Sequence, residues 1–426
     1  MQGVYRAYAH IKIGLKGESM TANDDFFQEQ KPAAVLKHSI LSEYCNVFTS
    51  MLGSHHEGPI WIIDGYAGPG SYDPSGDESE PTYGSPLIAA NLAREWGARS
   101  TRDLRCVFIE ADRHKATALR RNLEPFLRDG VDAVVLDGAV EEQLHPAWEL
   151  VSDAPVITFL DPFGVAMPRY LMTNLLLAPG RSRPSEVLLN INVEAVSRLG
   201  GCLERREGEI VPKRGQERSV EHVDEFLGDT WWRSQFYNAR NGDAGTAAVA
   251  AASVAKAFRR RIEEATGCLS ISIPIRRAPH HPDLFHLTLF FRHPYAGYKF
   301  ADAASRATYR WRTAYRARAW DAHENDTLSL FDEAEVAGLA AAEAARRERE
   351  LSAQSIATIS KNIRTLITER RQISLSNDIV DLLGTSLSFA GEKHIRRAWD
   401  ILSDERVVQP RNKAAKMYKA TMVAMR

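Results

Sequence analysis

The sequence contains few cysteines for its length, and they stand far apart. Its 426 residues include four cysteines, Cys45, Cys106, Cys202 and Cys268, and none belongs to a C-x-x-C pair. Zinc sites and redox couples that can be recognised in a sequence use such pairs. The pattern therefore predicts no metal site and favours a reduced, cytoplasmic setting.

Long apolar runs are also missing. No stretch approaches the roughly 20 uncharged apolar residues of a membrane span. The first residues lack a basic segment followed by an apolar one, so we expect neither membrane insertion nor secretion. The hydrophobic fraction of 44% and the charged fraction of 26% are ordinary for globular proteins. The length predicts a large domain and a smaller one.

A large net charge is absent, but the charge is unevenly distributed. The formal net charge is -1, yet residues from Arg346 onward carry 16 Lys and Arg against 9 Asp and Glu. This basic tail indicates a polyanionic partner such as RNA or DNA, although solvated helices often show the same imbalance. Charge alone leaves both interpretations open.

Strand-like and helix-like segments alternate over the first 300 residues. Apolar residues at helical spacing predict a helix over 31–52, with Lys37 and His38 near its polar side. Five near-continuous apolar runs follow, as parallel strands covered on both faces require: "WIIDG", "LRCVFIEAD", "VDAVVLDG", "PVITFLDPFG" and "SEVLLNINVEAV". The alternation predicts a doubly wound, Rossmann-like α/β sheet. "CLSISIPIRR" and "LFHLTLFFRH" predict an antiparallel hairpin at its edge.

The same pass along the chain predicts its organisation. We expect a flexible leader over 1–25, a sheet domain over 26–300 with a polar insertion at about 199–245, connecting helices over 301–350, and a C-terminal helical or winged-helix module over 351–426. Arginines and aromatic residues interleave from Tyr309 to Trp320. They suit contacts with phosphates and bases, or a helix that buries its aromatic residues and leaves its arginines in solvent.

The first predicted strand ends on an acid and a glycine-containing turn. Asp64 is followed by Gly65, Gly68 and Gly70. At the carboxyl end of a parallel strand, such a turn lets the backbone approach a nucleotide closely. The spacing D-G-x-x-G-x-G departs from the dinucleotide fingerprint G-x-G-x-x-G, so NAD is disfavoured.

Acids also end three later strands, at Glu110, Asp137 and Asp161. A single acid at a strand end is often a helix cap. Because the carboxyl ends of parallel strands meet at one edge, four such acids together favour a ligand crevice.

The motifs "DGYAGPG", "FIEAD", "VLDG" and "FLDPFG" together resemble those of class I S-adenosylmethionine-dependent methyltransferases. The resemblance implies that S-adenosyl-L-methionine is the cofactor. It implies that Asp64, Gly65, Gly68 and Gly70 lie near the methionine part, that Glu110 binds the ribose hydroxyls, and that Asp137 binds the adenine amine. A carboxylate suits a ribose because it can accept hydrogen bonds from both hydroxyls.

"DPFG", residues 161–164, resembles the [D/N]-P-P-[Y/F] motif of methyltransferases that modify exocyclic amines of bases, and the D-P-F-G of tRNA guanosine N-methyltransferases. It implies that Asp161 and the carbonyl of Pro162 accept the two amine hydrogens, while Phe163 stacks on the base. The same tetrapeptide is also ordinary chemistry for a turn after a strand.

Longer segments over about 24–300 resemble the three-Cys-motif partner proteins of bacteria. They are "DDFFQEQKPAAVLKHSILSEY", "IDGYAGPG", "GSPLIAA", "FLDPFG", "LLNINVEAVSR", "VDEFLGDTWW" and "RHPYAGYKF". This resemblance implies a methyltransferase-like protein that accompanies a radical-enzyme-like protein with three cysteines. It does not establish a substrate.

Together these patterns predict an S-adenosylmethionine-dependent methyltransferase acting on an exocyclic amine of a base in RNA or DNA, with the basic tail on the polyanion. Two alternatives stay open. One is a non-catalytic, cofactor-binding partner subunit of a radical-enzyme-like protein, and the other is a methyltransferase acting on a peptide or small molecule.

Overall fold

The computed structural model describes residues 32–52, 56–72, 82–99, 102–162, 167–180, 182–242, 245–278, 281–326 and 333–425. The leader predicted over 1–25 lies outside these ranges. Within them, no helix is both long and apolar enough to cross a membrane.

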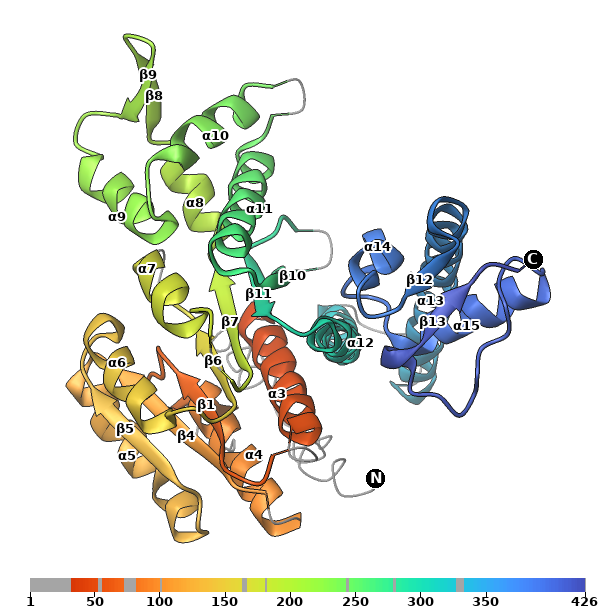
Figure 1. Ribbon diagram of the computed structural model, residues 1–426, viewed down its shortest axis with the longest axis horizontal. Helices are drawn as coiled ribbons and strands as arrows, with labels where there is room; N and C mark the ends of the chain where they lie inside the picture. The colour runs from red at the N-terminus through yellow and green to blue at the C-terminus, as the bar shows by residue number, and fades with distance from the viewer. Residues whose placement is uncertain are drawn as a thin grey trace.

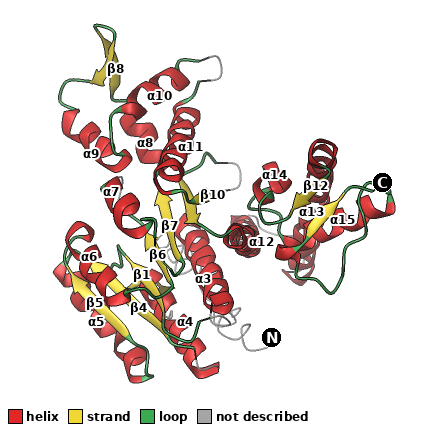
Figure 2. Cartoon of the chain, viewed as in Figure 1, coloured by secondary structure: helices red, strands yellow, loops and turns green. Residues whose placement is uncertain are grey.

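A mostly parallel sheet forms the centre of the first 300 residues (Figures 1 and 2). Its described strands are β1 Ile60–Asp64, β4 Leu104–Glu110, β5 Ala133–Asp137, β6 Val156–Leu160, β7 Ser185–Ile191, β10 Leu269–Ile275 and β11 Phe285–Phe291. They lie in the order β10-β11-β7-β6-β1-β4-β5, and only β11 runs antiparallel to its neighbours. This is a doubly wound, Rossmann-like order, with one antiparallel strand inserted next to the last position. The predicted sheet and edge hairpin are confirmed.

Helices cover both faces of the sheet because its strands are apolar on both sides. Neighbouring residues of one strand, such as Ile62 and Ile63, belong to two different buried clusters. One face carries α3 Pro32–Leu52, α4 Ser85–Arg99, α5 Arg113–Arg128 and α12 Pro294–Asp326, and the other carries α6 Val140–Val151, α8 Val193–Gly200 and α11 Ala247–Thr266. The helix predicted over 31–52 is present.

Short elements extend the second face. After β6 come α7 Arg169–Leu171 and the π-helix Met172–Leu176. The insertion consists of the hairpin β8 Leu203–Arg206 and β9 Glu209–Pro212, with α9 Glu217–Leu227 and α10 Trp231–Arg240. The fully buried Trp232 and Phe236 join it to the core. A small pair, β2 Ser71–Tyr72 and β3 Thr82–Tyr83, lies in the loop after β1.

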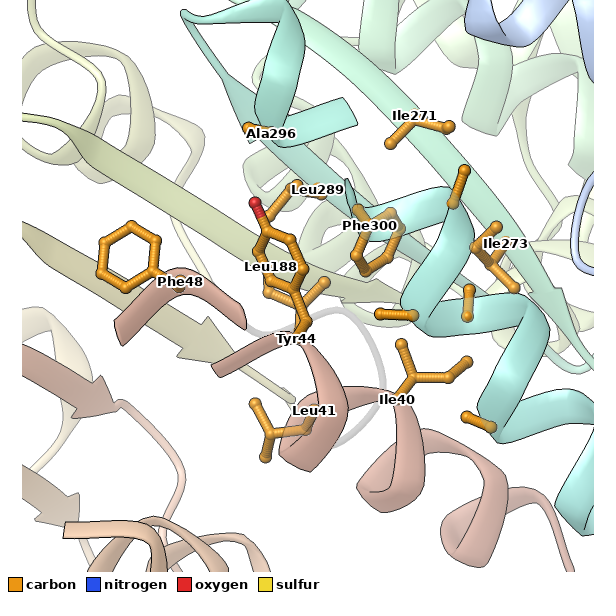
Figure 3. Close-up of a cluster of buried hydrophobic side chains, with 14 of the residues drawn as sticks. Ile40, Leu41, Tyr44, Phe48, Leu188, Ile271, Ile273, Leu289, Ala296 and Phe300 are labelled. Atoms are coloured by element: carbon orange, nitrogen blue, oxygen red, sulfur yellow. The ribbon is translucent and has the colours of Figure 1, made fainter. Parts of the chain in front are cut away.

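Helix α3 packs against both the sheet and α12, so it is buried over much of its circumference (Figure 3). Tyr44 packs edge-on against Phe300 of α12 with ring centroids 5.1 Å apart. Its hydroxyl donates to Glu186 of β7 at 2.7 Å. Burial raises the pKa of Glu186 to about 7, against the opposing effect of this hydrogen bond.

The C-terminal residues fold into a small helical module beside α12 (Figure 1). Its elements are α13 Glu333–Arg370, β12 Gln372–Ser374, α14 Ile379–Leu383, the 3-10 turns Gly384–Ser386 and Met417–Lys419, α15 Glu392–Asp404 and β13 Thr421–Val423. β13 pairs with β12, and Val408 bridges to Ala424. The predicted helical module is present, and its winged-helix form stays a prediction. Residues 410–420 connect the Val408 bridge to β13, and we call this loop the wing. Helix α13 carries the chain unbroken through residue 350, where we expect the module to begin.

Three described arginines of α12 form ion pairs with acids of other helices. Arg306 and Arg310, each 43% exposed, pair with Glu43 of α3, and Arg312, only 4% exposed, pairs with Glu348 of α13. Trp311 is buried. Arg312 is therefore not available to a phosphate, whereas for Arg306 and Arg310 both interpretations of this helix stay open.

The raised pKa of Glu186 predicts a pH-dependent stability. The unfolded chain loses this proton near pH 4.5, whereas the folded protein keeps it to about pH 7, so the carboxylate costs stability as pH rises through this window. In Glu186→Gln the amide oxygen still accepts from Tyr44. The variant should equal the wild type at about pH 5 and exceed it by on the order of 2 kcal/mol at about pH 8 in urea unfolding. A difference that does not change with pH would contradict this prediction.

Candidate active site

The strand register places the four predicted acids on one edge of the sheet. Asp64 lies opposite Phe108 of β4 and Phe159 of β6, so Glu110 and Asp161 extend two residues further on either side. Asp137 lies level with Glu110. The chain order reverses between β1 and β6, which is where doubly wound sheets bind ligands. Asp64 therefore lies at this switch point, two residues deeper in the sheet than Glu110 and Asp161.

The three glycines after β1 serve different purposes. A Cβ at Gly65 would come within 2.7 Å of Leu160, and one at Gly70 within 2.7 Å of Leu119. Gly68, in contrast, has φ of +66° and nothing within 4 Å of the position of a Cβ. Gly65 and Gly70 thus allow close packing, and Gly68 faces open space.

Glu110 fixes the conformation of this turn. Its Oε2 accepts from the Gly68 N–H at 2.7 Å, and its Oε1 accepts from the Asp112 N–H at 2.8 Å. The side chain is buried. Each oxygen keeps a further lone pair, so Glu110 can support the turn and still accept hydrogen bonds from a ligand.

Asp64 is almost fully buried, with 1% of its surface exposed. Its Oδ1 accepts from the Tyr66 N–H at 3.1 Å. Burial raises its pKa to about 7, and the Ser85 hydroxyl and the Tyr66 amide oppose this rise. Oδ2 is buried and has no partner in hydrogen-bond geometry among the described residues. Such an oxygen is costly to leave unpaired, so it can favour a ligand that carries a donor.

Asp137 lies at the exposed rim of the edge. Its Oδ1 pairs with Arg120 of α5 at 2.7 Å, and both side chains are about half exposed, at 44% and 46%. The Asp137 carboxylate, which we expect to bind adenine, is thus solvent-accessible and paired with the Arg120 guanidinium.

Asp161 is held from two other elements. Its Oδ2 pairs with Lys37 of α3, and its Oδ1 accepts from the Asn190 amide of β7 at 2.6 Å. The Lys37 side chain is 8% exposed and that of Asp161 26%. A buried cation beside a partly open carboxylate keeps the pair neutral overall and leaves the carboxylate accessible from the crevice.

The expectation that Lys37 and His38 lie near the polar side of their helix is wrong. Each is 7% exposed. Lys37 precedes Leu41 by four residues, which places it on the covered side of α3. Burial, together with the charge of Lys37, lowers the pKa of His38 to about 3, so this imidazole is neutral at physiological pH. In the sequence, the spacing of four residues between Lys37 and the apolar Leu41 indicated that Lys37 lies on the buried side of the helix.

The rest of "DPFG" is only partly described. Pro162 is buried after the end of β6. Phe163 and Gly164 lie outside the described residues. Asn192, a neighbour of Asn190 along the chain, caps α8 by accepting from the Ala195 N–H at 2.8 Å and does not join Asp161.

No protein-family model and no curated protein matches this chain. Among solved structures, it is similar to an O-methyltransferase from Bacillus cereus in complex with SAH, at 13% identity, 68% coverage of this chain, 97% coverage of the other and a TM-score of 0.30. It is also similar to a putative O-methyltransferase from Klebsiella pneumoniae, at 15% identity, 68% and 96% coverage and a TM-score of 0.28.

A third similar structure is the plantazolicin methyltransferase BpumL in complex with SAH, at 12% identity, 67% and 94% coverage and a TM-score of 0.28. These scores are too low to support a conclusion. The strand order and register show a doubly wound, Rossmann-like fold. Membership of the three-Cys-motif partner family stays a prediction.

The contact between Lys37 and Asp161 predicts coupled stabilities. Lys37→Met should cost about 2–4 kcal/mol, because it leaves a half-buried carboxylate without its cation. The double variant Lys37→Met/Asp161→Asn should be at least about 1 kcal/mol more stable than the sum of the single effects predicts. Urea unfolding of the wild type and the three variants measures this coupling. Additive losses would mean that the two charges do not interact in solution.

Proposed function

We propose that this protein is an S-adenosylmethionine-dependent methyltransferase that modifies an exocyclic amine of a nucleic-acid base. The observation that carries the proposal is the Asp161 carboxylate, oriented by Lys37 and Asn190 beside the glycine turn at the switch point of the sheet.

The crevice fits the cofactor in four respects. Open space at Gly68 allows a ligand to approach the backbone, and the unpaired Oδ2 of Asp64 suits an ammonium group. The free lone pairs of Glu110 suit a ribose diol. Asp137, level with Glu110, can accept from the adenine amine at the rim. When bound, S-adenosylmethionine supplies a methyl group that is already activated by its sulfonium.

Asp161 then has to orient the amine and raise its reactivity. An aromatic amine is a poor nucleophile because its lone pair is delocalised into the ring. Each Asp161 oxygen receives one protein donor, so an Asp161 oxygen keeps a lone pair for one amine hydrogen, and the carbonyl of Pro162 can accept the other. These hydrogen bonds concentrate electron density on the nitrogen, and the proton released after transfer can pass to the carboxylate. Lys37 and Asn190 hold that carboxylate in place, and in-line positioning supplies much of the remaining effect.

The C-terminal module supports a nucleic-acid substrate through its wing. In helix-turn-helix proteins the first residues of the recognition helix contact the bases. Here the first turn of α15 is covered by α12, because the Glu392 N–H donates to Asp302 at 2.8 Å. The wing instead exposes Lys413, Lys416 and Lys419. We therefore assign phosphate contacts to the wing.

Contacts with α12 hold the base of this wing in place. Tyr418 packs against Tyr295 with ring centroids 4.9 Å apart, and Lys299 lies 4.6 Å from the centre of the Tyr418 ring. These contacts join the wing to α12. Helix α12 in turn packs on α3, which carries Lys37.

Two isosteric variants separate chemistry from cofactor binding. Asp161→Asn should lower methyl transfer at least about 100-fold and leave the affinity for S-adenosylmethionine within a factor of about three. Glu110→Gln should weaken the binding of S-adenosylmethionine at least about tenfold. Isothermal titration measures the affinities, and labelled-methyl counts on total RNA and genomic DNA measure transfer. Normal turnover by Asp161→Asn would overturn the catalytic assignment, and undetectable transfer by a cofactor-bound wild type would favour the partner-subunit hypothesis.

Charge reversal on the wing should weaken binding to nucleic acid. Lys413→Glu/Lys416→Glu should reduce affinity for RNA or DNA at least tenfold at about 0.1 M salt and lower the salt dependence by roughly two released ions. Fluorescence anisotropy at several salt concentrations tests this. The matched control is Arg121→Glu/Arg128→Glu on exposed positions of α5. Equal losses in both double variants would mean that the effect comes from net charge alone.

A further inference from the structure

A second cavity lies between α11 and the edge hairpin. Its volume is about 280 Å³, and its polar lining consists of Lys256, Arg259, Ser272, Asp283 and His286. The first two belong to α11, three residues apart and hence on one side of the helix. None of these residues belongs to the crevice at Asp161.

The cations of this cavity lack a carboxylate partner within the described chain. Arg259 Nε is buried without a hydrogen bond, and burial lowers the pKa of its guanidinium. Asp283 also lines the cavity, but its oxygens already bind Arg276 at 2.7 Å and His286 at 3.0 Å. One turn after Arg259, Glu263 accepts from the Ser270 hydroxyl at 2.8 Å. The lining therefore offers donors and positive charge to an absent anion.

The cavity lies near the same edge of the sheet as Asp161, but on the opposite face, which α11 covers. Pro274 and His286 lie opposite each other near the ends of β10 and β11, and His286 lies opposite Ile191 at the end of β7. The next residue of β11, Leu287, lies opposite Asn190, whose amide holds Asp161. Three strand spacings separate β10 from β6, or about 15 Å.

We propose that the cavity binds a phosphate group of the substrate through Lys256, Arg259 and the Ser272 hydroxyl. A tetrahedral phosphate accepts hydrogen bonds in several directions, and an arginine with an unpaired N–H is well suited to it. The volume exceeds that of a phosphate alone, so an attached sugar also fits. The phosphate belongs to a polynucleotide backbone or to a free nucleotide. This inference rests on the proposed function for its substrate class.

Binding by the full-length chain tests the inference without any methyl transfer. The probes are inorganic phosphate, uridine monophosphate, a ten-residue uridine oligonucleotide and uridine, which lacks the phosphate. Titration calorimetry should detect the three phosphate-bearing probes and not uridine. Tighter binding of the oligonucleotide would identify a polynucleotide backbone as the natural source of the phosphate. Tighter binding of uridine monophosphate would identify a free nucleotide. Binding of uridine as strong as that of its monophosphate would overturn the proposal.

The decisive comparison uses neighbouring arginines. Arg259→Gln should weaken the binding of uridine monophosphate at least tenfold. Arg260→Gln, at the exposed next position of α11, should bind it as the wild type does. Arg259 is partly buried and forms no ion pair among the described residues, so Arg259→Gln should not lower the unfolding temperature without ligand. Lys256→Gln, at an exposed position, gives a second variant that keeps the fold, and it should bind several-fold more weakly. Equal affinities of the two arginine variants would overturn the proposal.

Asp161→Asn separates this test from that of the proposed function. It leaves the cavity untouched, so it should bind uridine monophosphate as the wild type does. Phosphate binding that persists in a protein without methyl transfer would overturn only the enzymatic proposal. Transfer that persists without phosphate binding would overturn only the cavity assignment.

Discussion

The ion pair between Lys37 and Asp161 is the contact on which the crevice depends. Helix α3 covers the sheet and packs against α12, so an ammonium group on this buried side requires a carboxylate. Asp161 provides it at the open edge, and Asn190 fixes the second oxygen. Three elements that are distant in the sequence thereby orient one carboxylate, which is what catalysis by positioning requires.

The same helices join the module to the edge of the sheet. A single buried cluster runs from α3 through α12 to the C-terminal helices, with Tyr44 against Phe300 at one end and Trp399 at the other. Close packing of this kind transmits a fixed orientation. The wing therefore has a defined position relative to Asp161, and so does the cavity behind the edge hairpin.

Much of the fold could be predicted from the sequence, because parallel strands covered on both faces are continuous apolar runs. The edge position of the acids followed from the strand ends. The separate roles of Gly65, Gly68 and Gly70 could not be predicted, because they depend on side chains of other strands and helices. The ion-pair partners of Arg310 and Arg312 could not be predicted either, since Glu43 and Glu348 come from other helices. Lys37 was misplaced because α3 is covered on more sides than a surface helix.

The most direct measurement is the chemical position of the transferred methyl group. RNA and DNA are each incubated with the protein and isotopically labelled S-adenosylmethionine, digested to nucleosides and analysed by mass spectrometry. An exocyclic amine held by Asp161 predicts label on the amino nitrogen of one base in one polymer. Label on a ring carbon, on a ribose oxygen, or only on protein would contradict the chemistry assigned to this carboxylate.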